Sequence, residues 1–135
     1  MKGNRYIIID DDPTSVELTT MIIKNSIENP FISAFTNAKE ALSFLETDFA
    51  TEIGYSTIVL LDLDMPVMNG WSFLDRFDLL SDKIKGRVKI IIVSGFDNVE
   101  NRRRAYQNRY VTEFIVKNDL YKNFYLDRKS TRLNS

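Results

Sequence analysis

Acidic, hydroxyl and ammonium side chains follow four of the apolar runs in this chain. Asp10 and Asp11 come directly after the first run, Asp62 after the third, Ser94 after the fourth and Lys117 after the last. Short runs rich in Ile and Val predict buried parallel strands, and open α/β sheets place their ligand site at the carboxyl ends of such strands. We therefore expect these side chains to share one polar pocket.

The acidic residues of this pocket favour a bound cation. Carboxylates about 4 Å apart repel one another by roughly 4 kcal/mol per pair at an effective dielectric constant near 20. An all-oxygen site with few protein ligands suits Mg²⁺, which commonly bridges protein carboxylates to phosphoryl oxygens. A second interpretation of Asp10, Asp11 and Asp12 stays open, in which they form a turn and cap a helix. Asp12 is expected to be only the cap.

The strands that would position these residues alternate with helices along the chain. This alternation predicts a three-layer α/β sandwich with a five-stranded parallel sheet and helices on both faces. Right-handed crossovers then give the strand order 2-1-3-4-5 of flavodoxin-like folds. The expected strands are residues 6–9, 31–35, 57–61, 88–93 and 111–116.

Capping residues mark where the helices are expected to begin. Asp12 precedes Pro13, and both Asn37 and Asp97 are followed three residues later by a Glu. These patterns are typical of an N-cap with Pro at the first helical position and of the capping box. The first helix is expected to turn an apolar stripe toward the sheet, formed by Val16, Met21, Ile23 and Ile27.

The final segment, residues 127–135, is polar and has no apolar periodicity. It resembles the translation of a common sequencing-library adapter, and an ordinary polar tail is the alternative interpretation. We expect one domain over residues 1–126, followed by a tail that is not native. The last helix would begin near Asn118 or Asp119 and would be cut short at this junction.

Composition excludes several classes of chemistry. The chain has no Cys and no His, which removes disulfides, thiolate metal sites, imidazole general bases and most zinc sites. Hydrophobic residues make up 44% of the chain, which is ample for one core, but no apolar stretch approaches the roughly 20 residues of a membrane span. The net charge is −1, and the sequence has no basic stripe extensive enough to bind a nucleic-acid backbone. We expect a cytoplasmic domain without direct nucleic-acid or membrane binding.

The segment from Asp62 to Gly70 carries the most specific motif. It resembles the Asp-x-x-Met-Pro-x-Met-x-Gly loop of the receiver domain of two-component response regulators. That family also has an acidic pair after the first strand, Ser or Thr after the fourth and Lys after the fifth. Asp10 with Asp11, Ser94 and Lys117 match these positions in the same order. The resemblance covers residues 6 to about 126 and supports a single-domain protein similar to the chemotaxis regulators.

The resemblance implies a phosphoacceptor that assists its own phosphorylation and dephosphorylation, rather than an enzyme. Asp62 would attack the phosphohistidine of a sensor histidine kinase or phosphotransfer protein. Asp10, Asp11, Asp62 and the backbone carbonyl of Asp64 would hold Mg²⁺. Lys117 would supply a fixed positive charge to the carboxylate and then to the phosphoryl oxygens.

The resemblance also implies a switch. Ser94 would move toward the phosphoryl group and Phe114 would rotate inward, changing an output face made of the fourth helix, the fifth strand and the last helix. Residues 102–104 are three consecutive arginines on the fourth helix. They are either a solvated helix face or part of the surface that binds a downstream partner.

Some residues depart from the family pattern. Asn118 follows Lys117 where the family usually has Pro, so the loop that orients the lysine is expected to differ. One alternative is a pseudo-receiver that binds partners without phosphorylation. A less favoured alternative is a haloacid-dehalogenase-type phosphatase, whose nucleophile motif resembles the spacing of Asp62 and Asp64. Pro66 stands where those phosphatases have Thr or Val.

Overall fold

A computed structural model of the chain describes residues 4–47 and 56–122, so the predicted tail at 127–135 lies outside the described residues. The strands are β1 (Asn4–Ile9), β2 (Phe31–Phe35), β3 (Ser56–Leu61), β4 (Val88–Ser94) and β5 (Val111–Val116). The helices are α1 (Pro13–Ser26), α2 (Ala38–Thr47), α3 (Gly70–Phe77), α4 (Asp82–Lys85) and α5 (Val99–Gln107). Residues 117–122 are also helical.

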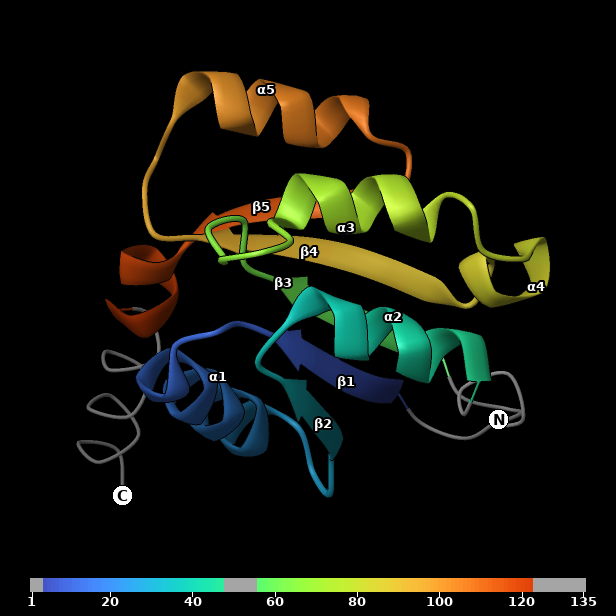
Figure 1. Cartoon of the computed structure of the whole chain (residues 1–135). Coiled ribbons are helices and arrows are strands. Elements are labelled where there is room, and N and C mark those ends of the chain that lie inside the picture. Colours follow the sequence, from blue (N-terminus) through green and yellow to red (C-terminus); the bar gives the residue numbers. More distant parts are fainter. Residues whose placement is uncertain (1–3, 48–55, 123–135) are drawn as a thin grey trace.

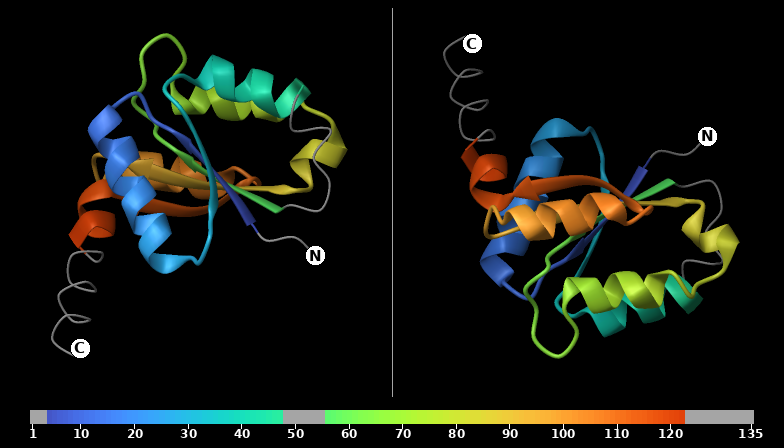
Figure 2. Two further views of the ribbon diagram at one scale, coloured as in Figure 1. Left: turned by 90° about the horizontal axis from the view of Figure 1, so that it is seen from below. Right: turned by 90° about the horizontal axis from the view of Figure 1, so that it is seen from above.

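The strands form one parallel sheet in the order β2-β1-β3-β4-β5, which confirms the predicted flavodoxin-like fold (Figure 1). Helices α2 and α3 cover one face of the sheet, while α1 lies on the other beside residues 117–122 (Figure 2). None of the helices in the described ranges is long and apolar enough to cross a membrane.

The core has two clusters, one on each face of the sheet, because successive side chains of a strand point in opposite directions. The two clusters differ in size. Ile7 and Ile9 of β1 belong to the larger cluster, together with residues of α2, α3 and α5. Tyr6 and Ile8 point the other way and form a small cluster with Ile23 of α1. Among the described residues, helix α1 therefore packs through a smaller apolar cluster than the helices on the other face.

The helix caps agree with the sequence predictions at two positions and differ at a third. The Asp12 side chain accepts a hydrogen bond from the Thr14 amide and caps α1, and the Asn37 side chain accepts one from the Glu40 amide. The prediction that Asp97 caps the next long helix was wrong. Asn98 is the cap of α5, because its side chain accepts a hydrogen bond from the amide of Asn101 in the first turn. Asp97 instead pairs with Arg102.

The inner face of α1 also differs from the prediction. Its buried residues are Ser15, Thr19 and Ile23, whereas Met21 and Ile27 are each 40% exposed. Residues 15, 19 and 23 are spaced by four, so they form one stripe along a helix. The sequence pattern followed the apolar residues and missed the two hydroxyl residues, and Ser15 contacts a residue of the predicted pocket.

Candidate functional site

The sheet register places Asp10 beside Asp62. Ile9 of β1 pairs with Leu61 of β3, so the next residue of each strand lies at the same carboxyl edge. The amide of Asp62 donates to the Ile9 carbonyl at 2.9 Å, and the amide of Asp10 donates to the Phe35 carbonyl at 3.1 Å. Both aspartates are buried, and their neighbouring ends bring two carboxylates into one enclosed space.

Asp11 completes an acidic cluster. Carboxylate oxygens of Asp10, Asp11 and Asp62 all lie within 4.8 Å of one another, and Asp11 is exposed to solvent. Asp10 is further fixed by the amide of Asp12, which donates to its Oδ1 at 3.0 Å. Two buried carboxylates and one exposed carboxylate offer oxygen ligands to a hard cation that keeps some of its water, which fits Mg²⁺.

Burial and charge both act on the protonation of Asp62. The pKa of Asp62 is raised to about 6, mainly because its carboxylate is removed from water and next because of the nearby charge of Asp10. The Lys117 ammonium and the Asp64 amide lower the pKa but do not cancel this effect. A cation bound to the cluster would favour the ionised carboxylate, which is the form that can act as a nucleophile.

Lys117 reaches the same cluster from the end of β5. Its Nζ lies 2.8 Å from Asp10 Oδ2 and 3.8 Å from Asp62 Oδ1. Burial acts to lower the pKa of Lys117, but the hydrogen bond to Asp10 and the charge of Asp62 outweigh burial and raise the pKa above its usual value. The side chain therefore stays an ammonium and places a positive charge between the two buried carboxylates.

The Lys117 ammonium has a third contact that the sequence did not indicate. Its Nζ donates to Ser15 Oγ at 3.2 Å, and Ser15 Oγ in turn donates to Asp12 Oδ2 at 3.1 Å. Ser15 and Lys117 are 102 positions apart in the chain. No local spacing pattern connects such distant residues, so only the three-dimensional arrangement reveals this contact.

Ser94 lies at the same edge but its hydroxyl is bonded elsewhere. Ser94 pairs in the sheet with Val116, the residue directly before Lys117, and its side chain is almost fully buried. Its Oγ donates to the Phe96 carbonyl at 3.0 Å and accepts from the Phe96 amide at 3.3 Å. The hydroxyl thus closes the loop that leads into α5, and it would have to turn to bind a ligand in the acidic pocket.

The loop after Asp62 is tightly built. The amide of Gly70 donates to the Leu63 carbonyl at 3.0 Å, and the amide of Asp64 lies 3.4 Å from Asp62 Oδ1. A Cβ atom at Gly70 would come within 2.7 Å of the Asp62 carbonyl oxygen. The glycine at the end of the motif is therefore required because the backbone of α3 lies against the residue that carries the candidate nucleophile.

Phe114, the predicted switch residue, already lies inside the protein. Its side chain is buried in the larger core cluster, and its amide donates to the Tyr106 hydroxyl of α5 at 3.1 Å. The Arg102 guanidinium covers the ring, with its carbon 4.9 Å from the ring centroid. Two residues of α5 therefore hold this part of β5.

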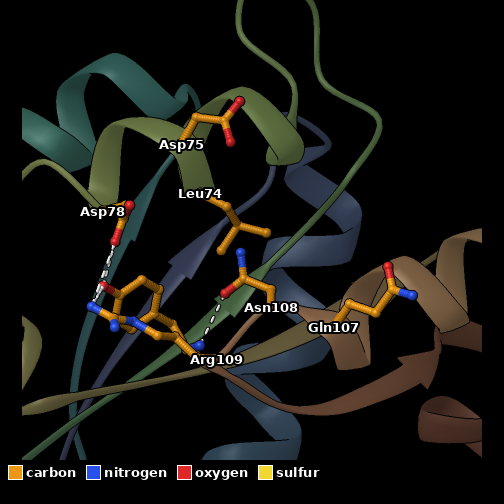
Figure 3. A pocket seen from close by; sticks show the side chains of 7 residues that line it. Leu74, Asp75, Asp78, Gln107, Asn108 and Arg109 are labelled. Atoms are coloured by element: carbon orange, nitrogen blue, oxygen red, sulfur yellow. Dashed lines mark hydrogen bonds and ion pairs between the residues drawn. The ribbon is translucent and has the colours of Figure 1, made fainter.

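A cavity in the described part of the chain lies away from the acidic cluster. It has a volume of about 390 Å³ and is lined by Leu74, Asp75, Asp78, Gln107, Asn108, Arg109 and Tyr110. Figure 3 shows these residues, with Asp78 and Arg109 joined through the phenol of Tyr110. Tyr110 directly precedes β5, so this cavity is at the amino edge of the sheet. It contains none of the predicted site residues.

Comparison with known proteins adds an independent finding. Residues 6–122 match the family model of the response regulator receiver domain. The structure is similar to that of a two component response regulator from Cytophaga hutchinsonii, with a TM-score of 0.78 and 24% identity, covering 92% of this chain and 98% of the other.

Two curated proteins are also similar in sequence. An uncharacterized 14.6 kDa protein from Leptolyngbya boryana is 28% identical over 111 residues, which are 79% of this chain and 76% of that protein. A protein-glutamate methylesterase/protein-glutamine glutaminase 2 from Methanospirillum hungatei is 27% identical over 103 residues, or 76% of this chain. The chain spans only 26% of the length of that second protein.

Proposed function

The chain belongs to the response regulator receiver domain family, and we propose that it is a cytoplasmic phosphoacceptor of a two-component phosphorelay, with Asp62 as the residue phosphorylated. The observation that carries this proposal is the position of the Asp62 carboxylate. It is buried at the carboxyl edge of β3, beside Asp10 and 3.8 Å from the Lys117 ammonium. The phosphodonor would be the phosphohistidine of a histidine kinase or phosphotransfer protein.

The proposed reaction needs little more than position and charge. A carboxylate oxygen of Asp62 attacks the phosphorus in line, the phosphorus–nitrogen bond of the donor breaks, and its electron pair leaves with the imidazole nitrogen. Lys117 holds a positive charge where the phosphoryl oxygens arrive. The product is an aspartyl phosphate on Asp62, and the donor histidine is released without its phosphoryl group.

Asp10, Asp11, Asp62 and the backbone carbonyl of Asp64 are the residues proposed to hold Mg²⁺. The three carboxylates fit this role because their oxygens lie within 4.8 Å of one another. When bound, the ion would neutralise charge on the transferred group. The same carboxylates explain why Lys117 alone is not enough, since one ammonium cannot balance three acidic groups and an incoming phosphoryl group.

The switch proposed for this chain begins at Ser94. To donate to a phosphoryl oxygen, its hydroxyl would give up the two hydrogen bonds to Phe96 that close the loop before α5. Phe114 needs no inward rotation from the described position, so we assign it the role of supporting the loop and α5. A downstream partner would bind α5, β5 and the last helix, and direct nucleic-acid contact is not part of the proposal.

Exposure to a small-molecule phosphodonor with Mg²⁺, followed by intact mass measurement, tests the assignment of Asp62. We expect one added phosphoryl group on the wild type and none on Asp62→Asn. Asp75→Asn, a change of an exposed aspartate on α3, is the matched control and should be labelled like the wild type. Labelling of Asp62→Asn, or none of a folded wild type, would remove Asp62 from its role.

This labelling, together with an assay of phosphoester turnover, separates the alternatives from the proposal. A pseudo-receiver would stay unlabelled and folded, and a haloacid-dehalogenase-type phosphatase would turn over small phosphoesters in many cycles. The family match over residues 6–122 favours the receiver over the phosphatase, and the cluster of Asp10, Asp11, Asp62 and Lys117 favours it over the pseudo-receiver. A stoichiometry of one label per chain, without turnover of an unrelated phosphoester, is the result that supports the phosphoacceptor.

A further inference from the structure

Ser15 connects the first turn of α1 to the ammonium group of the site. The residue is buried, and its hydroxyl lies between Asp12 and Lys117. A serine hydroxyl has one proton to donate. Because that proton points to Asp12, the oxygen presents its lone pairs to Lys117. The direction of both hydrogen bonds is thus fixed by the chemistry of the groups.

Two anchors from separate elements hold the ammonium. Asp10, after β1, accepts one N–H at 2.8 Å, and Ser15, on α1, accepts another at 3.2 Å. An ammonium has three N–H groups in a tetrahedral arrangement. When two of them are bound, the direction of the third is set. The remaining N–H is then available to the Asp62 carboxylate, 3.8 Å away, and to the phosphoryl group that would be attached there.

The chain around Lys117 gives a reason for a second anchor. Lys117 follows β5 directly and is the first residue of the helical segment 117–122, and the next residue is Asn118. Figures 1 and 2 both show this segment beside α1, so α1 is the neighbour that can hold the lysine side chain.

We propose that Ser15 is a positioning residue, which orients the Lys117 ammonium toward Asp62 and the incoming phosphoryl group. The proposal rests on the proposed phosphoacceptor function, because it assigns the purpose of the contact. Ser15 does not itself touch the reacting atoms. A purely structural serine would only satisfy its own helix cap through Asp12, and its removal would leave Lys117 in place.

The first test compares rate constants of phosphorylation by a small-molecule phosphodonor with Mg²⁺. Ser15→Ala removes the anchor and should slow phosphorylation about tenfold, since the hydrogen bond lost is to a charged group. Ser15→Thr keeps the hydroxyl and should stay within about twofold of the wild type. Thr19→Val, one turn further along the buried stripe of α1, removes a hydroxyl away from Lys117 and should leave the rate unchanged.

A double substitution shows whether Ser15 acts through Lys117. If it does, Ser15→Ala should lower the rate constant of phosphorylation when Lys117 is present. It should cause no further loss in Lys117→Ala, because the partner of Ser15 is already missing there. An equal further loss in both backgrounds would overturn the proposal. This comparison remains decisive if Ser15→Thr fails to fold, and circular dichroism of every variant checks folding beforehand.

A measurement without phosphorylation keeps this inference separate from the proposed function. The proton–nitrogen correlation signal of the Lys117 ammonium should be visible in the wild type and in Thr19→Val, and should broaden or vanish in Ser15→Ala. If the wild type accepts no phosphoryl group but its signal depends on Ser15, the phosphoacceptor function fails and the anchor stands. If the wild type is phosphorylated, and Ser15→Ala keeps both the Lys117 signal and the wild-type rate constant of phosphorylation, Ser15 has no positioning role.

Discussion

Asp62 has to be ionised to act as a nucleophile, and the fold opposes its ionisation. Burial and the charge of Asp10 raise its pKa to about 6, against 3.8 for an ordinary aspartate. In metal-free solution above that pH the native state holds an unfavourable charge, which costs stability that the unfolded chain does not pay. The residue is therefore placed for chemistry at the expense of the stability of the fold.

Asp62→Asn should consequently raise the free energy of unfolding by roughly 1 to 3 kcal/mol in metal-free buffer at pH 7.5. The favourable contribution of a protonated Asp62 is fully present below about pH 4 and is lost as the pH rises through about 6. The gain from the substitution should therefore shrink as the pH falls from 6 toward 4. Denaturant unfolding of both proteins at several pH values measures it.

Magnesium supplies the control for this prediction. Saturating Mg²⁺ should stabilise the wild type more than Asp62→Asn, since a ligand that binds only the native state stabilises it by mass action. The difference in stability between the two proteins should then narrow. A difference that is unchanged by both pH and Mg²⁺ would show that the Asp62 charge is not its cause.

Val67 carries a different local conflict, in its backbone. It has a φ of 68°, in the left-handed region that β-branched residues avoid, and its side chain is 98% exposed. The side chain therefore gains nothing from packing that would offset the strain. This residue lies in the loop between Asp62 and Gly70, where an unusual backbone conformation is expected to support the position of a site.

Val67→Gly should stabilise the protein by about 0.5 to 1 kcal/mol, because relief of left-handed strain exceeds the entropy cost of the glycine. Leu79→Gly is the matched control: Leu79 is also exposed, at 80%, but lacks a positive φ. It should destabilise by roughly 0.5 to 1 kcal/mol through the unfolded state. Thermal and denaturant unfolding compare the pair, and a loss of stability in both would contradict strain at Val67.

At the scale of the elements, β3 and α3 meet where Gly70 lies against the Asp62 backbone. Gly70→Ala should destabilise the fold by about 2 to 3 kcal/mol, because its Cβ would come within 2.7 Å of the Asp62 carbonyl oxygen and 2.9 Å of the Leu63 Cα. Gly95→Ala has no atom within 4 Å of its Cβ and should change stability by less than about 1 kcal/mol. Unfolding measurements on both variants test whether the contact, rather than glycine as such, matters.

The elements themselves were largely predictable from the sequence. Runs of Ile and Val gave the strands, since a strand buried on both faces needs apolar residues at consecutive positions. The carboxyl ends of these strands then placed Asp10, Asp62 and Lys117 at one edge. Short polar elements were not predictable in the same way. Helix α4 has only one buried residue, Ile84, so it leaves no periodic signal.

Choices between adjacent polar residues also escaped the sequence. Asp97 and Asn98 can both cap a helix, and the hydrogen bond from Arg102 to Asp97 leaves Asn98 to bind the α5 amide. Ser15 escaped because its partner is distant in the chain. An apolar stripe predicts which face of a helix is buried, but a buried hydroxyl depends on what the fold brings opposite to it.

At the scale of the whole molecule, the site and the proposed output face meet through the loop between β4 and α5. Only Ala105 of α5 is buried. The helix is otherwise held by polar and cation–ring contacts. The Tyr106 hydroxyl accepts from the Phe114 amide, and Arg102 and Arg104 lie over the rings of Phe114 and Trp71 at 4.9 and 4.2 Å. A helix with so few apolar contacts is easily displaced, and the hydrogen bonds of Ser94 to Phe96 fix the segment that leads into it.

Phosphorylation of Asp62 should therefore speed hydrogen exchange of the Phe96 amide by about fivefold or more, the lower end of a typical allosteric coupling. The reason is that Ser94, when it binds the phosphoryl group, no longer accepts from this amide. Amides of α2 should not change, because the cap of that helix is the hydrogen bond from the Glu40 amide to the Asn37 side chain, which does not involve Ser94. Exchange measured by mass spectrometry, with and without the phosphodonor, compares the segments.

The control is Ser94→Ala. In this variant the Phe96 amide should already exchange rapidly before phosphorylation, and phosphorylation should not speed its exchange further. If phosphorylated wild type leaves Phe96 as protected as before, the signal does not pass through Ser94, and α5 must respond to the pocket by another route.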